Sequence, residues 1–176
     1  MPRRRPHPPT APGRPAFTTT ELLVVVAVLG IASALVLPTF RDHDTLQLRR
    51  AAALLAADLD AARAGSLTHA DDPRLVVFDA DDHAYHVAAA SDPATPVTNP
   101  FDRRPYRVAF GTGRAAALGL VTLDAWSLNG DDAVGFGVYG QLDQTTPATV
   151  TLRAGDTRLT LTLDPDTGEA SIGDFH

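Results

Sequence analysis

The sequence predicts an α+β protein with one long N-terminal helix followed by a β-rich domain. An apolar run from Leu22 to Leu37 continues without a break into apolar residues at helical spacing, and the rest of the chain alternates short apolar runs with turn residues. Spacings of three and four are typical of an amphipathic helix, whereas short runs bounded by Gly, Pro and Asp are typical of strands. The 176 residues are enough for one such domain and its helix.

The segment Phe17–Pro38 has the length and composition of a membrane-spanning helix. Its 22 residues extend about 33 Å as a helix, close to the hydrocarbon thickness of about 30 Å. Four arginines and no acid precede it: Arg3, Arg4, Arg5 and Arg14. Because positive charge stays on the cytoplasmic side of a membrane, we expect a single-pass helix with its N-terminus in the cytoplasm.

Two ordinary alternatives share this pattern. A basic stretch before an apolar run is also typical of a cleaved secretory signal or of a plain signal anchor. The small residues Ala32 and Ala34, which resemble a signal cleavage site, lie inside the run rather than beyond it. Glu21 argues against a plain anchor, because an ionised carboxylate inside the membrane costs about 2.5–3.5 kcal/mol. We therefore expect Glu21 to have a specific task.

The second half of the expected helix is amphipathic. Beyond Pro38, which is expected to kink the helix, apolar residues recur at helical spacing: Leu48, Ala52, Leu55, Leu59 and Ala62. Charged residues are expected on the other faces of the same helix: Arg49, Arg50, Asp58, Asp60 and Arg63. Gly65 and Ser66 are a plausible stop, so the helix is predicted to run from about Thr18 to Ala64.

Seven or eight strands are predicted after the helix. They cover 75–78, 85–89, 106–110, 118–126, 134–139, 150–152, 159–163 and 169–172. The first two are expected to form a hairpin through the acidic turn 79–82. The proline-rich segment 91–105 is expected to be a loop, and 164–168 a turn.

The charge distribution disfavours nucleic acid as a partner. Beyond Ala16, eleven arginines face all 21 acids of the chain, a formal charge of −10. Such a domain repels phosphate backbones. One cluster keeps a DNA-contacting alternative open: Arg103, Arg104, Arg107 and Arg114.

The sequence contains no pattern that indicates an enzyme. Cysteine and lysine are both absent, and neither G-x-S-x-G nor H-E-x-x-H occurs. The segment 135–140 fits G-x-G-x-x-G, but polar turn residues follow it where a dinucleotide site needs a helix, so a glycine-rich strand with a bulge is favoured. No cofactor is expected.

Calcium is the one cofactor alternative that the sequence leaves open. The segment Asp164–Glu169 partly resembles a calcium loop, yet its glutamate directly follows its glycine, so a hairpin turn is favoured. For the pairs Asp71-Asp72 and Asp131-Asp132, a turn is likewise favoured over a calcium site.

The segment Ala16–Leu22 resembles the processing site of type IV pilins and type II secretion pseudopilins. In that family a prepilin peptidase cuts just before a phenylalanine, whose new amino group is then methylated. The resemblance places the cut between Ala16 and Phe17 and makes Glu21 the fifth residue of the mature chain. Gly30 inside the apolar helix and Pro38 at its end match the family's offsets, as positions where the helix kinks. Ala16 stands where glycine is usual.

The resemblance implies a pilin-like fold and a division of the chain into four parts. These are a cytoplasmic leader (1–16), a transmembrane helix (17–38), an amphipathic continuation (39–65) and a periplasmic β-rich head (66–176). It implies location in the inner membrane, with assembly into a periplasmic filament. The implied partners are other pseudopilins or pilins, the prepilin peptidase and the inner membrane. The Phe17 ammonium of one subunit is expected to meet Glu21 of its neighbour.

The order of elements resembles the minor pseudopilin H and FimT-type group, through residues 130–173 of the head. This implies a structural minor pseudopilin of a type II secretion pseudopilus, a part of the protein secretion machinery. The alternative is a minor pilin of a type IV or competence pilus that contacts DNA. A membrane-tethered binding domain that never polymerises would require Phe17 to stay uncleaved.

Overall fold

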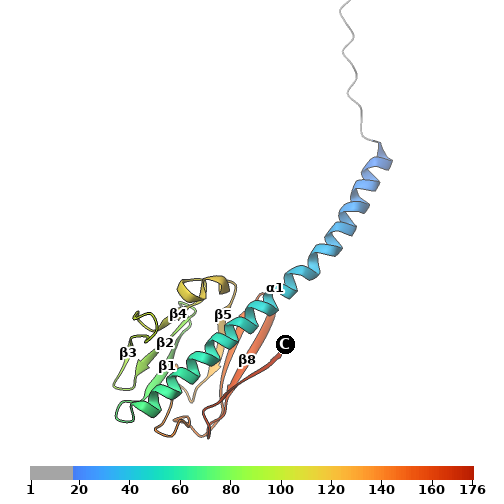
Figure 1. The fold of residues 1–176 in the computed structure, drawn as a ribbon. Coiled ribbons are helices and arrows are strands. Elements are labelled where there is room, and N and C mark those ends of the chain that lie inside the picture. The colour runs from blue at the N-terminus through green and yellow to red at the C-terminus, as the bar shows by residue number, and fades with distance from the viewer. Residues whose placement is uncertain (1–17) are drawn as a thin grey trace, which may run out of the picture. The chain divides into compact units, whose positions relative to one another are not determined.

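The computed structural model describes residues 18–176, except for the side chains of residues 34–42. The chain divides into two compact units, one up to Thr39 and the other from Phe40 to His176. One helix, α1 (Thr19–Thr68), supplies residues to both units, and the strands all follow it (Figure 1).

The helical stripe predicted for the second half of α1 is confirmed. Its members are at most 1 % exposed: Leu48, Ala52, Leu55, Leu59 and Ala62. The end of the helix differs from the prediction, since α1 continues past Gly65 to Thr68. Gly65 allows a close approach instead of stopping the helix, because a Cβ there would lie 2.8 Å from Cγ of Arg74. Oγ of Ser66 accepts a hydrogen bond from the Arg74 amide at 2.8 Å, which also holds the end of α1 against the first strand after it.

The first sheet is antiparallel and contains five strands in the order β3-β2-β1-β6, with β4 also paired to β2. The strands are β1 (Arg74–Asp79), β2 (Ala84–Ala89), β3 (Asp92–Pro96), β4 (Arg107–Ala109) and β6 (Ala133–Gly135). The predicted β1–β2 hairpin is confirmed, with Phe78 opposite Tyr85. Its turn is closed by Asp79, whose Oδ1 accepts hydrogen bonds from the amides of Asp81 and Asp82.

The second sheet is a four-stranded antiparallel sheet in the order β5-β7-β8-β9. Its strands are β5 (Thr122–Ser127), β7 (Ala148–Ala154), β8 (Thr157–Leu163) and β9 (Ala170–Phe175). The alternation predicted for the β7–β8 pair is confirmed: Val150 pairs with Leu161 and Leu152 with Leu159, all at most 1 % exposed. Because side chains alternate across a strand, the intervening threonines lie on the opposite face.

The core joins α1 to both sheets. Figure 1 shows the C-terminal half of α1 running along the sheets, and one buried cluster contains Leu55 of α1, Val76 of the first sheet and Leu161 of the second. The fold is therefore α+β as predicted, with a long helix packed on two antiparallel sheets.

Two predictions for the middle of the chain are wrong. The expected loop 91–105 contains β3, an edge strand of the first sheet that tolerates Pro93 and Pro96 because an edge strand leaves some of its amides without a ladder partner. The expected strand 118–126 begins only at Thr122, because a 3-10 helix, η1 (Gly113–Leu118), precedes it. The alanine-rich sequence of η1 has little preference for strands. The predicted strand 134–139 is also shortened, since β6 ends at Gly135.

Candidate assembly segment and the buried Asp58 cluster

Glu21 lies in the first turn of α1 and is exposed. Its backbone amide donates a hydrogen bond to Oγ1 of Thr18, the residue before the helix, at 3.2 Å. A threonine followed three residues later by glutamate is the sequence of a capping box. An acid in a first helical turn gains about 0.3–1 kcal/mol from the helix dipole. This is less than the cost of about 2.5–3.5 kcal/mol for placing the same charge inside a membrane, so capping alone does not account for Glu21 in an apolar helix.

The helix that follows Glu21 is apolar on every side. Its large hydrophobic residues are 45–66 % exposed: Leu22, Leu23, Val24, Val25, Val26, Val28, Leu29 and Ile31. Around Gly30 no atom lies within 4 Å of the position of an added Cβ. A helix that is apolar all round is normally buried, in a membrane or against other helices. We call residues 18–33 the assembly segment.

Several predicted site residues fall outside the part of the chain that the structure describes. Ala16 and Phe17, the expected processing site, precede the described residues. The bounds of α1 include Pro38, but its side chain is among those not described. Within the described residues, no helix reaches the length and apolarity that a membrane span requires.

Asp58 was expected on a face of α1 other than the apolar stripe, but it is buried together with that stripe. The residue is 3 % exposed and lies at the centre of a buried polar cluster. Its Oδ2 accepts a hydrogen bond from Oη of Tyr85 at 2.7 Å, and its Oδ1 accepts one from Oη of Tyr106 at 3.0 Å. Nη2 of Arg114 forms an ion pair with Oδ2 of the same carboxylate. The cluster thus links α1 to β2, to the segment before β4 and to η1.

The protonation states of the residues around Asp58 make all three of them hydrogen-bond donors to its carboxylate. Burial raises the pKa of Tyr85 well above its ordinary value, with a further rise from Tyr106. Burial also raises the pKa of Tyr106, and Asp102 adds to the effect. Both hydroxyls therefore stay protonated at neutral pH and donate to Asp58. Burial lowers the pKa of the Arg114 guanidinium, but arginine stays charged at neutral pH.

The four arginines that suggested a possible DNA contact differ in their partners. Arg114 is committed to Asp58, and its guanidinium lies 5.1 Å from the centre of the Tyr106 ring. Arg107 pairs with Asp82 at 2.5 Å and with Asp79 at 3.6 Å. Two of the four arginines are thus paired with carboxylates of α1 or of the head, and the other two, Arg103 and Arg104, have no carboxylate partner among residues 18–176.

The acidic loop Asp164–Glu169 is stabilised by hydrogen bonds within its own turn. Oδ1 of Asp164 accepts hydrogen bonds from the amides of Asp166 and Thr167 and from the Thr167 hydroxyl. These bonds lower the pKa of Asp164 and fix the hairpin turn between β8 and β9. In residues 18–176, no group of three or more His, Asp or Glu side chains is arranged to hold a metal ion.

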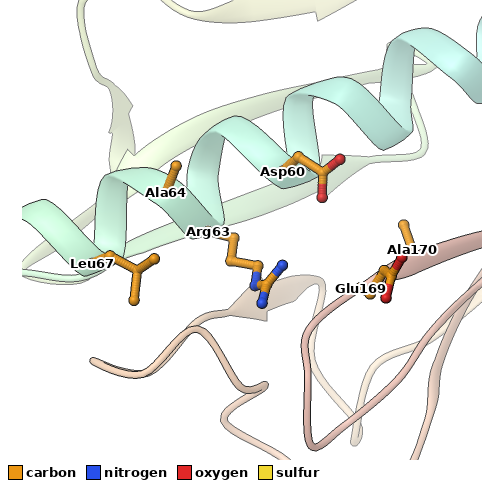
Figure 2. A pocket seen from close by; sticks show the side chains of 6 residues that line it. All are labelled: Asp60, Arg63, Ala64, Leu67, Glu169 and Ala170. Atoms are coloured by element: carbon orange, nitrogen blue, oxygen red, sulfur yellow. The ribbon is translucent and has the colours of Figure 1, made fainter.

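The glycine-rich segment 135–140 forms a turn, and no helix follows it. The Gly140 amide donates to the Gly137 carbonyl at 2.9 Å, and Nε of Arg63 donates to the Gly140 carbonyl at 3.1 Å. A hollow of about 390 Å³ lies beside this contact, and Figure 2 shows Asp60 and Arg63 of α1 pointing toward Glu169 and Ala170 across it. Through this hydrogen bond, Arg63 links the glycine-rich segment 135–140 to α1.

Gly168 makes the closest contact of this turn. It has a φ of 68°, and an added Cβ would overlap the Gly140 carbonyl oxygen. We expect Gly168→Ala to lower the free energy of unfolding by about 2–4 kcal/mol, from backbone strain and from the overlap. Urea denaturation measures this change. Gly113→Ala is the matched control, because Gly113 also has a positive φ but has no atom within 4 Å of its Cβ position. Equal losses for the two variants would contradict the overlap.

The fold resembles the solved structures of a minor pseudopilin and of a minor pilin. The minor pseudopilin EpsH from the type 2 secretion system of Vibrio cholerae matches with a TM-score of 0.52 and 13% identity, over 72% of this chain and 96% of that one. The type IV minor pilin FimU of Pseudomonas aeruginosa matches in two crystal forms at 15% identity, with TM-scores of 0.51 and 0.53. These matches cover 72% and 74% of this chain and 93% and 90% of FimU. The sequence matches neither a protein-family model nor a curated protein.

These matches confirm the architecture that the N-terminal motif implied. Both proteins carry a fold that covers nearly the whole of their own chains and most of this one. The chain has the type IV pilin-like fold, and in fold it is similar to a minor pseudopilin and to a minor pilin.

Proposed function

We propose that the chain is a structural minor pseudopilin of a type II secretion pseudopilus. The observation that carries the proposal is a pilin-like head on a helix whose exposed apolar segment begins with a single acid, Glu21. The prepilin peptidase removes residues 1–16, and the amino group of Phe17 is methylated. Residues 17–38 hold the subunit in the inner membrane, and residues 66–176 lie in the periplasm.

In this proposal the assembly segment drives polymerisation. Removal of the leader creates a cation on Phe17, four residues from the Glu21 carboxylate. Neither charge is stable alone in hydrocarbon, so each gains from a partner of opposite sign. A neighbouring subunit, offset along the filament, supplies the amine for Glu21. The apolar side chains around Glu21 pack against neighbouring helices, and Gly30 and Pro38 are the positions where the helix adjusts its direction.

The proposed function is tested by mass spectrometry and filament recovery. The chain is expressed with its native secretion genes, and filaments are sheared and collected. The expected result is a mature chain that begins with N-methylated Phe17 and occurs in the filament fraction with other pseudopilins. A chain that retains Met1 and stays wholly in the membrane fraction would support the non-polymerising tethered domain instead.

A second candidate is a minor pilin of a type IV or competence pilus. The observation that favours it is the match to FimU, whose TM-scores of 0.51 and 0.53 lie on either side of the 0.52 of EpsH. Deletion of the gene separates the two: loss of protein secretion supports the pseudopilus, whereas loss of pili or of DNA uptake supports the pilus. Because Arg107 pairs with Asp82 and Arg114 with Asp58, DNA contact by the four-arginine cluster gains no support.

The residue before the expected cut gives a separate prediction. Ala16 stands where this family usually has glycine, and its methyl group crowds a peptidase site shaped for glycine. We expect Ala16→Gly to raise the rate of leader removal several-fold and Ala16→Val to block it. Pulse labelling followed by gel separation of the precursor and mature forms measures the rate. Equal processing of all three chains would show that the cut does not fall after residue 16.

A further inference from the structure

A tight turn at residues 128–131 connects β5 of the second sheet to β6 of the first. Its central residues, Asn129 and Gly130, have φ values of 58° and 98°, and its first carbonyl accepts a hydrogen bond from its last amide at 3.3 Å. Positive φ at both central residues is typical of a type I′ turn, for which Asn-Gly is a favoured sequence. The geometry of the turn therefore explains why these two residues occur here. We call residues 128–131 the Asn129 turn.

The Asn129 turn is anchored at its ends and open at its tip. Leu128, its first residue, is 2 % exposed. Asp132, which directly follows the turn, accepts a hydrogen bond from the Trp126 indole at 3.0 Å. Between these anchors Asn129 and Gly130 are exposed, and apart from its chain neighbours no atom lies within 4 Å of the position of an added Cβ at Gly130. Water therefore reaches both residues at the tip.

The backbone nitrogen of Gly130 is free to react with the side chain before it. Among residues 18–176, neither the Gly130 amide nor the Asn129 side chain takes part in a hydrogen bond. An amide that donates to no acceptor gives up its proton more readily than a hydrogen-bonded one. Because glycine has no Cβ, its nitrogen also approaches the carbonyl carbon of the asparagine side chain without a steric clash.

We propose that Asn129 is a site of spontaneous deamidation, in which water converts its side-chain amide to a carboxylate. Hydroxide removes the proton of the Gly130 amide, and the nitrogen attacks Cγ of Asn129. The new C–N bond closes a cyclic imide, and the side-chain nitrogen takes a proton from water and leaves as ammonia. Water then opens the imide at either carbonyl, which gives aspartate or, when the main-chain bond breaks, isoaspartate. One water is consumed and one ammonia released, so no oxidant or cofactor is needed.

The reaction changes both the charge and the length of the connection between the sheets. The new carboxylate lies close in sequence to those of Asp131 and Asp132, in a head that is already acidic. In the isoaspartate product the chain runs through Cβ, which adds one methylene to the backbone of the Asn129 turn. The site lies wholly on the head, so the proposal does not depend on the assembly segment or on the system that the subunit serves.

Asn99 is an internal control, because it is the only other asparagine of the chain. It is 5 % exposed, and its Oδ1 accepts a hydrogen bond from the Phe101 amide at 2.9 Å. The residue that follows it is Pro100, whose nitrogen carries no proton and cannot close the imide. Asn99 should therefore remain asparagine under conditions in which Asn129 reacts.

Peptide mass spectrometry of the aged protein tests the proposal. The full chain in an uncharged detergent is kept folded at neutral and at mildly alkaline pH and sampled over weeks, and a second sample in urea is the unfolded reference. Pepsin digestion at acid pH, where the reaction is slow, gives the peptides, and chromatography separates aspartate from isoaspartate. Asn129→Gly is the matched variant, because glycine accepts the φ of 58° and has no amide to lose.

We expect residue 129 of the folded chain to gain about one dalton, at a rate within about tenfold of the unfolded reference, because an exposed turn tip opens at little cost in free energy. The rate should rise with pH, both products should form, and neither Asn99 nor the Asn129→Gly peptide should gain mass. The proposal is overturned if Asn129 stays unchanged in the folded chain while the unfolded reference converts, or if Asn99 reacts equally fast. Formation of aspartate alone would also overturn it, because the imide gives both products.

Discussion

Replacement of Asp58 by alanine is expected to lower the free energy of unfolding of the head by about 3–5 kcal/mol. The carboxylate is 3 % exposed and receives two tyrosine hydroxyls and the Arg114 guanidinium. Its removal leaves two buried tyrosine hydroxyls without their acceptor and the partly exposed Arg114 guanidinium without its counterion. The loss is costly because each buried donor left without an acceptor costs about 1–3 kcal/mol.

Urea unfolding followed by Trp126 fluorescence measures this loss. Trp126 is the only tryptophan of the chain and stacks on Phe78 of the first sheet, so its emission reports on the core. Asp60→Ala is the matched control, because Asp60 lies on the same helix but is exposed, and we expect a change of about 0.5 kcal/mol or less. Similar losses for the two variants would show that Asp58 does not organise the core.

A second pair of variants separates the ion pair from the packing. Asp58→Leu combined with Arg114→Met replaces both charges by apolar groups. We expect this double variant to be more stable than Asp58→Leu alone by at least about 1 kcal/mol, because no charge is left unpaired. A double variant that is less stable than either single variant would contradict this account, since the two residues would then contribute independently.

Replacement of Glu21 by glutamine is expected to reduce recovery of the chain in filaments by at least about tenfold. Glutamine keeps the length of the side chain and leaves the bond from the residue 21 amide to Thr18 intact, so the first turn of α1 is preserved. Only the charge is lost, and a charge pair that contributes about 1.4 kcal/mol to each subunit contact accounts for a tenfold change. Leader removal and stability of the head should not change.

Immunoblotting of sheared filaments against the membrane fraction gives the recovery. Glu169→Gln is the matched control, because residue 169 is the only other glutamate of the chain and lies in the β8–β9 turn of the head. Normal incorporation of Glu21→Gln would show that the acid serves only the first helical turn. An equal loss for both variants would show that the effect reflects overall charge.

Local sequence patterns predicted the parts of the fold that depend on periodicity. The buried face of α1 and the alternating β7–β8 pair follow from hydrophobic spacing alone, and the structure confirms both. Asp58 was missed because its surroundings are not local. Its partners Tyr85, Tyr106 and Arg114 lie 27, 48 and 56 positions away in the sequence. A charged residue within an otherwise apolar helical stripe is the one signal that would have pointed to it.

The middle of the head was hard to predict for a different reason. In β3 the residue preferences oppose the structure, since prolines are rare in strands. In η1 the alanines agree with the helical turn, but the apolar run around them resembles a strand. Tertiary contacts decide these segments: β3 pairs with the edge of β2, and Ala115 and Leu118 of η1 are buried. For the assembly segment, the sequence placed Glu21 near the helix start correctly, while Ala16 and Phe17 lie outside the described residues.

The two prolines of β3 also bear on how the head behaves at high concentration. An open sheet edge offers backbone donors to any passing strand and is a route to aggregation. Pro93 and Pro96 interrupt this row of donors on a strand of five residues. The edge of the first sheet is therefore a poor template for added strands. Many such heads side by side can then associate through side-chain contacts without fusing their sheets into amyloid-like ribbons.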